Sequence, residues 1–203
     1  MYNQLQFRIL DRIENNQFGV FMLTDFLDLA SYEAIKKSLQ RLEQSGQIRR
    51  LCRGIYDKPK FNQKFQMFEA PNIDNIAKAI AYRYNWRICP SGNFALNLLG
   101  LSTQIPAQYI YISDGPYKNY NVMGTDIVFK HVAHREISGY SNITHLVLQA
   151  IKTIGRKNIM REDIYHLRKF LKPEEKRIIL SESQRVSVWM YEIVKDICEV
   201  DNV

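Results

Sequence analysis

The feature that most constrains the fold is the run of residues 31–56, which begins with the pattern of a capped amphipathic helix. Ile35, Leu39 and Leu42 follow the i, i+4, i+7 spacing that places side chains on one face of a helix. Ser31 precedes them at the position of an N-cap, where a hydroxyl accepts a hydrogen bond from a free backbone N–H. The run therefore predicts a helix with one apolar face and one polar face.

A short hairpin is predicted directly after this helix. Gly46 is suited to end the helix, because glycine adopts the left-handed backbone conformation at little cost. Residues 47–51 alternate enough to form a strand, residues 52–54 can turn the chain, and residues 55–56 can return as a second strand. A helix followed by a basic hairpin is typical of the recognition helix and wing of a winged helix-turn-helix.

The preceding residues are consistent with the same unit. An apolar stripe from Leu5 to Ile13 has helical spacing, and Gly19 interrupts the pattern. We expect Thr24 to cap a short second helix over residues 25–29. The order of helix, short helix, recognition helix and wing then leaves no long loop in this part of the chain.

The predicted helix and wing carry most of the net charge. Residues 36–53 contain six Lys or Arg residues and one Glu, and so hold five of the seven net positive charges of the chain. Such a cluster is often only a solvated surface. Here the charges lie on the two elements that contact DNA in this fold, where they would neutralise phosphates. The predicted DNA contacts are Tyr32, Lys36, Lys37, Gln40, Arg41, Arg49, Arg50 and Arg53.

The remaining residues predict a second, mixed α/β domain that ends in a helical bundle. The predicted division is a winged-helix domain at 1–60, a linker at 61–72 and a C-terminal domain at 73–203, which makes the fold class α+β. Nine Lys or Arg residues between 156 and 185 are interpreted mainly as the solvated face of helices, with an extended nucleic-acid footprint as the alternative. The expected strands are 88–89, 108–113 and 126–131, and the expected helices are 73–84, 92–99, 143–154, 162–171 and 173–198.

The sequence shows no clear pattern of catalytic or metal-binding residues. The three cysteines are scattered and form no CxxC pair, which argues against a zinc site. His131 and His134 would point to opposite faces of a strand, so they are not expected to chelate a metal with Glu136. We therefore expect no enzyme, no metal and no cofactor. An enzymatic reading would require Asp114, Asp126 and His131 to lie within about 4 Å of one another around a pocket.

The chain is expected to be cytoplasmic. No stretch approaches the roughly 18 apolar residues that a membrane-spanning helix needs. The first residues carry charges of both signs, which is not the pattern of a signal peptide. The expected oligomeric state is a monomer or a homodimer.

Two segments, taken together, resemble a known family. The first is Arg-Gly-Ile-Tyr-Asp-Lys-Pro at 53–59, and the second is the segment 90–107 followed by Tyr-Ile-Ser-Asp-Gly at 111–115. They resemble the AbiEi-type antitoxins of type IV toxin–antitoxin systems, in a short subgroup labelled as a domain of unknown function. The similarity extends over about residues 5–180.

This resemblance implies an N-terminal winged helix that binds double-stranded DNA at the operon's own promoter. It also implies a C-terminal domain that opposes a nucleotidyltransferase-like toxin, with no stable complex required. The leading interpretation is therefore a transcriptional autoregulator and antitoxin of an abortive-infection, phage-defence system. The alternative is a protein-interaction module that masks the toxin or its target, with DNA binding incidental.

Overall fold

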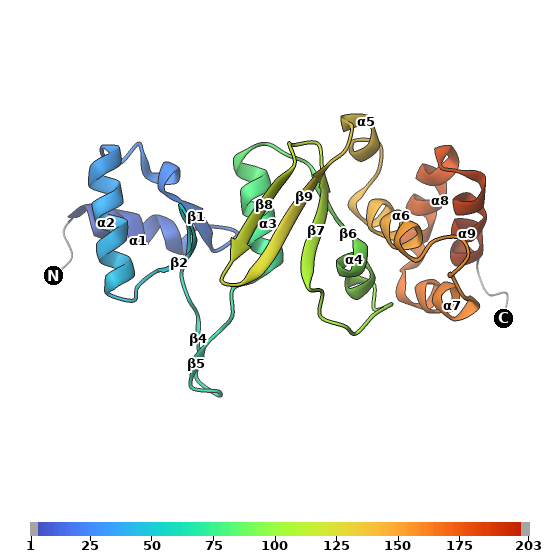
Figure 1. Cartoon of the computed structure of the whole chain (residues 1–203), viewed down its shortest axis with the longest axis horizontal. Coiled ribbons are helices and arrows are strands. Elements are labelled where there is room, and N and C mark those ends of the chain that lie inside the picture. The colour runs from blue at the N-terminus through green and yellow to red at the C-terminus, as the bar shows by residue number, and fades with distance from the viewer. Residues whose placement is uncertain (1–3, 200–203) are drawn as a thin grey trace. The chain divides into compact units, whose positions relative to one another are not determined.

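The computed structural model describes residues 4–199, and the chain divides into two compact units. The first unit contains the residues up to Asn85 together with Tyr120–Gly124, and the second contains Trp86–Asn119 and the residues from Thr125 onward. Both contain helices and strands, so the predicted α+β class is confirmed (Figure 1). The outermost residues of the predicted domains, 1–3 and 200–203, lie outside the described residues.

The first unit combines helices with two small antiparallel sheets. One sheet has the strand order β1-β3-β2, and the other is the β4–β5 hairpin. The elements are α1 (Gln4–Glu14), β1 (Val20–Met22), the 3-10 helix η1 (Leu23–Phe26), α2 (Tyr32–Gln44), β2 (Arg49–Cys52), β3 (Ile55–Asp57), β4 (Phe61–Asn62), β5 (Met67–Phe68) and α3 (Ile73–Arg83).

The predicted apolar stripe of α2 lies at the centre of this unit. Ile35, Leu39 and Leu42 are fully buried and belong to a cluster that also includes Ile9 of α1 and Phe26 of η1. Side chains four and seven positions apart share one face of a helix, so burial of this stripe directs the opposite face of α2 to solvent. The packing of the core therefore decides which residues of α2 can meet a partner.

The cap expected for the short helix of the first unit is wrong. Thr24 does not cap the short helix, which is a 3-10 turn that begins at Leu23. The Asp25 carboxylate accepts a hydrogen bond from the backbone N–H of Met22 at 2.7 Å and so closes that turn. The segment 61–72, expected to be a linker, contains the β4–β5 hairpin. The first compact unit also includes α3.

Only some of the residues at helix N-cap positions make a capping hydrogen bond with their side chain. Asn72 caps α3, because its side chain accepts a hydrogen bond from the backbone N–H of Asn75 at 2.9 Å. Ser31 and Ser91 occupy N-cap positions, but neither side chain makes a capping hydrogen bond. The Ser91 hydroxyl instead donates to the Gln149 side chain at 2.9 Å, a partner distant in the sequence.

The second unit holds most of a four-stranded sheet and a group of helices. The sheet order is β6-β7-β9-β8, in which β7 runs antiparallel to β6 and parallel to β9. The sequence did not predict β8, whose last residues belong with the first unit. The elements are β6 (Ile88–Ser91), α4 (Gly92–Leu98), β7 (Gln108–Ser113), β8 (Lys118–Val122), β9 (Thr125–His131), α5 (His134–Ile137), α6 (Asn142–Ile154), α7 (Arg161–Phe170), α8 (Pro173–Glu182), the 3-10 helix η2 (Ser183–Arg185) and α9 (Val188–Cys198).

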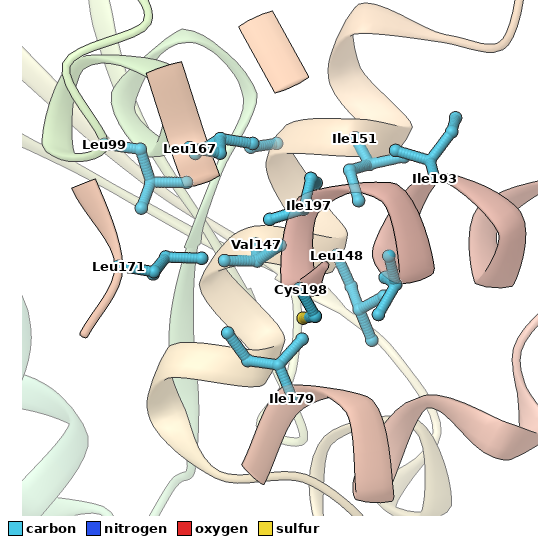
Figure 2. Packing of buried hydrophobic residues seen from close by; sticks show 12 residues of the cluster. Leu99, Val147, Leu148, Ile151, Leu167, Leu171, Ile179, Ile193, Ile197 and Cys198 are labelled. Carbon is cyan, nitrogen blue, oxygen red and sulfur yellow. The ribbon is translucent and has the colours of Figure 1, made fainter. Parts of the chain in front are cut away.

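Helix α6 provides the centre of the helical core. Val147 and Ile151 on α6 are fully buried, and they belong to a cluster with Leu167 of α7, Ile179 of α8 and Ile197 of α9 (Figure 2). Each such side chain contributes about 1.5–3 kcal/mol when it leaves water. No helix within residues 4–199 is long and apolar enough to cross a membrane.

The single helix expected over residues 173–198 is interrupted. Helix α8 ends at Glu182, and α9 begins at Val188 after the short η2 turn. The Glu182 carboxylate accepts hydrogen bonds from the backbone N–H and the hydroxyl of Ser141, both at 2.8 Å. Ser141 is the N-cap of α6. The break therefore places a carboxylate at the start of α6, where the helix dipole favours negative charge.

Replacing Glu182 by Gln should lower stability in a pH-dependent way. Burial raises the pKa of Glu182, but hydrogen bonds from Thr144 and Ser141 outweigh this effect, and the net pKa lies below its ordinary value. The stabilisation is therefore complete above the pKa of the unfolded chain and is lost as the pH falls through the lower folded pKa. We expect a loss of about 1 kcal/mol near neutral pH. Thermal melts across pH check this, and a deficit that persists at acidic pH would contradict it.

Candidate nucleic-acid interface

The outward face of α2 exposes most of the predicted DNA contacts. Lys36, Lys37, Gln40 and Arg41 are exposed, and Tyr32 in the first turn is 53% exposed. The three cations of this face make no hydrogen bond or ion pair with any residue in the range 4–199. Their charges are therefore available for an anionic partner.

The β2–β3 hairpin adds two more exposed cations. Arg53 lies at the turn beside Gly54, whose φ of 80° is in the left-handed region that favours glycine. Arg50 lies opposite Tyr56 in the strand register, and its only polar contact among the described residues is a 3.4 Å bond from Nε to the Cys52 carbonyl. These two guanidinium groups extend the positive charge of α2 onto the hairpin.

Tyr56 belongs to the core side of the hairpin. Its ring is half-buried and stacks on Phe21 with a centroid separation of 6.0 Å. Burial raises the pKa of the Tyr56 hydroxyl, against an opposing effect of the nearby Arg50 charge. The side chain therefore contributes mainly to packing.

Arg49 occupies a different environment from the other predicted contacts. Its Nε donates to the Asp57 carboxylate at 3.0 Å, its Nη2 pairs with the second oxygen of the same carboxylate, and its Nη1 donates to the Glu69 carbonyl at 2.9 Å. The Arg49 and Asp57 side chains are only 20% and 10% exposed. Arg49 therefore joins β2, β3 and the end of the β4–β5 hairpin, and its contact with DNA stays a prediction.

Removal of Asp57 should be much more costly than removal of an exposed ion-pair partner. Asp57→Ala leaves the half-buried Arg49 guanidinium without its counter-ion, so we expect the free energy of unfolding to fall by about 2–4 kcal/mol. Asp28→Ala is the matched control, because the Arg12–Asp28 pair is exposed (42% and 62%). That variant should lose much less stability, because solvent screens an exposed ion pair. Urea unfolding measures both, and equal losses would show that Arg49 is not a structural anchor.

The β4–β5 hairpin carries aromatic side chains that the sequence reasoning did not single out. Phe61, Phe65 and Phe68 are exposed, and the rings of Phe61 and Phe68 pack edge to face at 5.3 Å. The available signal was Asn62, whose side chain accepts hydrogen bonds from the backbone N–H groups of Lys64 and Phe65. Asn favours such a turn, because its side chain can bond the backbone two residues further on.

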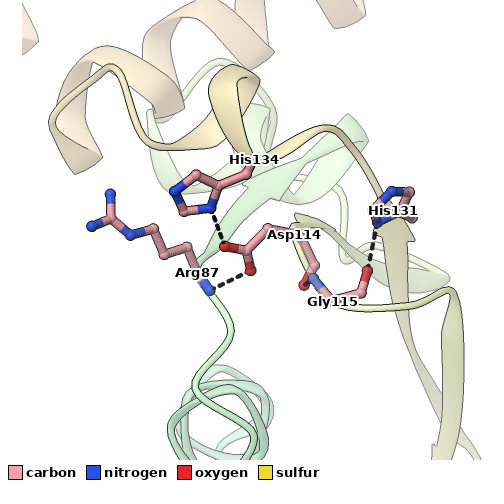
Figure 3. Close-up of polar contacts among 6 residues, drawn as sticks. Arg87, Asp114, Gly115, His131 and His134 are labelled. Atoms are coloured by element: carbon pink, nitrogen blue, oxygen red, sulfur yellow. Dashed lines mark hydrogen bonds and ion pairs between the residues drawn. The ribbon is translucent and has the colours of Figure 1, made fainter.

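A separate polar cluster in the second unit contains the histidines considered for metal binding (Figure 3). His134 Nδ1 lies 2.9 Å from the Asp114 carboxylate, which also accepts from the backbone N–H of Arg87 at 2.8 Å. His131 Nδ1 lies 2.9 Å from the Gly115 carbonyl and so uses a different partner. These bonds fix the turn that follows β7.

The residues that an enzymatic site would require do not lie close together. Asp126 pairs with Gln108 and His131 pairs with Ser113, so the two lie at opposite ends of β9. At the rise of a β-strand this separation is about 16 Å, well beyond the 4 Å that shared chemistry needs. Within residues 4–199, no three His, Cys, Asp or Glu side chains are grouped so that they could hold a metal ion.

The basic residues of the C-terminal helices are partly engaged within their own unit. Arg168 donates from Nε to the Asp196 carbonyl at 3.1 Å, and Lys169 lies 4.4 Å from the centre of the Tyr165 ring. Others, such as Arg156 and Lys157, are exposed. This patch lacks the combination of a helix face and a hairpin that distinguishes the first unit.

The chain is a small mixed α+β protein with exposed basic residues on α2 and on the β2–β3 hairpin. The profile of the family of unknown function DUF6088 matches residues 8–179, and the chain belongs to this family. The crystal structure of the RV2827C protein from Mycobacterium tuberculosis is similar, with a TM-score of 0.50 and 10% identity over 98% of this chain and 77% of that chain. That likeness concerns the fold alone. A search of curated protein sequences returned no match.

Proposed function

We propose that this protein is a DNA-binding transcriptional autoregulator and the antitoxin of a type IV toxin–antitoxin system. The observation that carries the proposal is the exposed basic surface of the first unit. It combines the outward face of α2 with Arg50 and Arg53 of the β2–β3 hairpin, which are both exposed and have no acidic partner among the described residues. Lys and Arg side chains without internal partners gain most from contact with phosphates, because their charges are not already neutralised.

The order and packing of the elements support a winged helix. Helices α1, η1 and α2 share one apolar cluster, and β2–β3 follows α2 after Gly46, whose φ is 72°. Strand β1 pairs with β3 and completes a three-stranded sheet. In this assignment α2 is the recognition helix and β2–β3 is the wing.

The outward face of α2 suggests distinct roles for its residues. Gln40 carries an amide that can bond an adenine edge in the major groove, whereas Lys36 and Arg41 can bond phosphates or guanine. Glu33 is exposed on the same helix. A carboxylate is repelled by phosphate but can accept a hydrogen bond from the amino group of cytosine. Glu33 would thus favour a cytosine in the operator.

Charge reversal on the wing should weaken binding to all duplexes. If α2 and the wing together neutralise about five phosphates, the logarithm of affinity should fall with the logarithm of salt at a slope near −4.5. Arg50→Glu combined with Arg53→Glu should make this slope shallower and weaken binding at least tenfold. Fluorescence anisotropy on a duplex from the region upstream of its own gene measures both effects.

Two variants serve as comparisons for this measurement. Lys157→Glu changes an exposed charge in the second unit and should leave affinity unchanged. Gln40→Ala should reduce the preference for the upstream duplex over a scrambled one more than it changes the salt slope, because an amide reads base edges. An affinity that does not depend on salt would contradict the electrostatic account.

The antitoxin activity should survive the loss of DNA binding. The resemblance to AbiEi-type antitoxins assigns this activity to the C-terminal part of the chain, with a nucleotidyltransferase-like toxin as its target. We therefore expect the Arg50→Glu, Arg53→Glu variant to restore growth of cells that express a nucleotidyltransferase-like protein encoded beside this gene. Failure of the wild type to restore growth would overturn the antitoxin assignment. Co-purification of a stable complex would instead favour a module that masks the toxin.

A further inference from the structure

The β4–β5 hairpin exposes an unusual concentration of large apolar side chains. Phe61 is 49% exposed, Phe65 65%, Met67 60% and Phe68 57%. Single exposed apolar residues are normal on a protein surface, but a contiguous group marks an interaction site. Figure 1 shows the hairpin extending away from the helices of the first unit.

Hydrogen bonds at the base of the hairpin hold it in a defined conformation. The backbone N–H of Glu69 donates to the Lys60 carbonyl at 2.8 Å, and the Arg49 guanidinium holds the Glu69 carbonyl from the side of β2. An isolated two-stranded hairpin is only marginally stable in water, so these anchors explain how so short a ribbon keeps its shape. The Asn62 turn then places Phe65 at the tip.

The charges on the hairpin indicate the chemistry of its partner. Lys60 and Lys64 are exposed, and the Lys64 ammonium lies 5.6 Å from the centre of the Phe65 ring. The one acidic residue between 58 and 70 is Glu69, at the base of the ribbon. Aromatic rings can stack on flat apolar groups, and the lysines between them can pair with negative charges, so the hairpin fits a partner in which the two alternate. Stacked bases between phosphates are such a surface.

We propose that the β4–β5 hairpin is a second DNA-contacting arm. Phe65 wedges against a base step beside the site that α2 and the wing occupy, while Lys60 and Lys64 neutralise the adjacent phosphates. Apolar side chains that enter a base step unstack it and kink the duplex. This inference rests on the proposed DNA binding and extends it, because binding by α2 and the wing alone requires no such distortion.

The link through Arg49 favours DNA over other occupants. The same guanidinium that is paired with the wing residue Asp57 also holds the base of the hairpin, so wing and arm keep a fixed spacing within one unit. An anionic membrane would attract the same side chains. Membrane binding, however, does not require these side chains to be fixed next to the elements that are proposed to contact DNA.

The experiment uses the full chain and a duplex from the region upstream of its own gene, labelled at both ends for energy transfer. A 2-aminopurine reports base unstacking. We expect the wild type to shorten the end-to-end distance and to raise 2-aminopurine emission. Phe65→Ser should abolish both signals and weaken binding about tenfold. The matched control is Phe7→Ser, which removes a phenyl ring that is 68% exposed on α1 of the same unit and should behave like the wild type.

The outcomes separate the arm from the proposed function. If Phe65→Ser distorts DNA like the wild type, while the Arg50→Glu, Arg53→Glu variant loses binding, the arm is overturned and the winged-helix assignment stands. If the wild type binds no duplex, both the proposed DNA-binding function and the proposed role of the hairpin are overturned. Vesicles that contain phosphatidylserine provide the last test. Loss of vesicle binding in Phe65→Ser, with unchanged DNA distortion, would overturn the arm in favour of a membrane contact.

Discussion

The N-terminal unit depends on the way in which Arg49 is bound. One guanidinium satisfies the Asp57 carboxylate in a bidentate arrangement and also holds the Glu69 carbonyl, so three segments of the chain meet at one charged group. Moving charges out of water is unfavourable, and only good geometry with additional hydrogen bonds offsets the cost. Because the guanidinium is planar, this geometry also fixes direction. The β2–β3 sheet and the following hairpin are thus held in one arrangement.

Helix α2 has two faces, one that packs in the core and one that is exposed to solvent. Its apolar stripe is anchored by the same cluster that holds α1 and η1, so the helix cannot rotate without exposing Ile35 or Leu39. The outward side chains are consequently presented in a fixed order. A partner of this face, as proposed above, would meet a preorganised surface, which lowers the entropic cost of binding.

Much of this architecture could be predicted from local sequence patterns. The contacts between segments that are distant in the sequence could not. The stripe of α2 follows from helical spacing, and Gly46 ends its helix because it is free to adopt a positive φ. Strands β4 and β5 have two residues each, too few to show an alternating pattern. The partners of Arg49 lie 8 and 20 positions away, so a phosphate contact and an internal ion pair look identical in the sequence. The break after α8 contains neither Pro nor Gly, and the partner of Glu182 at its start is Ser141, 41 positions away.

The return of Tyr120–Gly124 to the first unit has a consequence for how the protein is made and how it evolves. Translation releases the N-terminus first, and domains tend to fold as they emerge from the ribosome. Here the first unit is complete only after residue 124 has been synthesised, and the residues of β6 and β7 are synthesised before that point. Recombination at a single point near residue 85 would separate this segment from its unit. Related chains are therefore expected to inherit both units together and not to exchange them as independent modules.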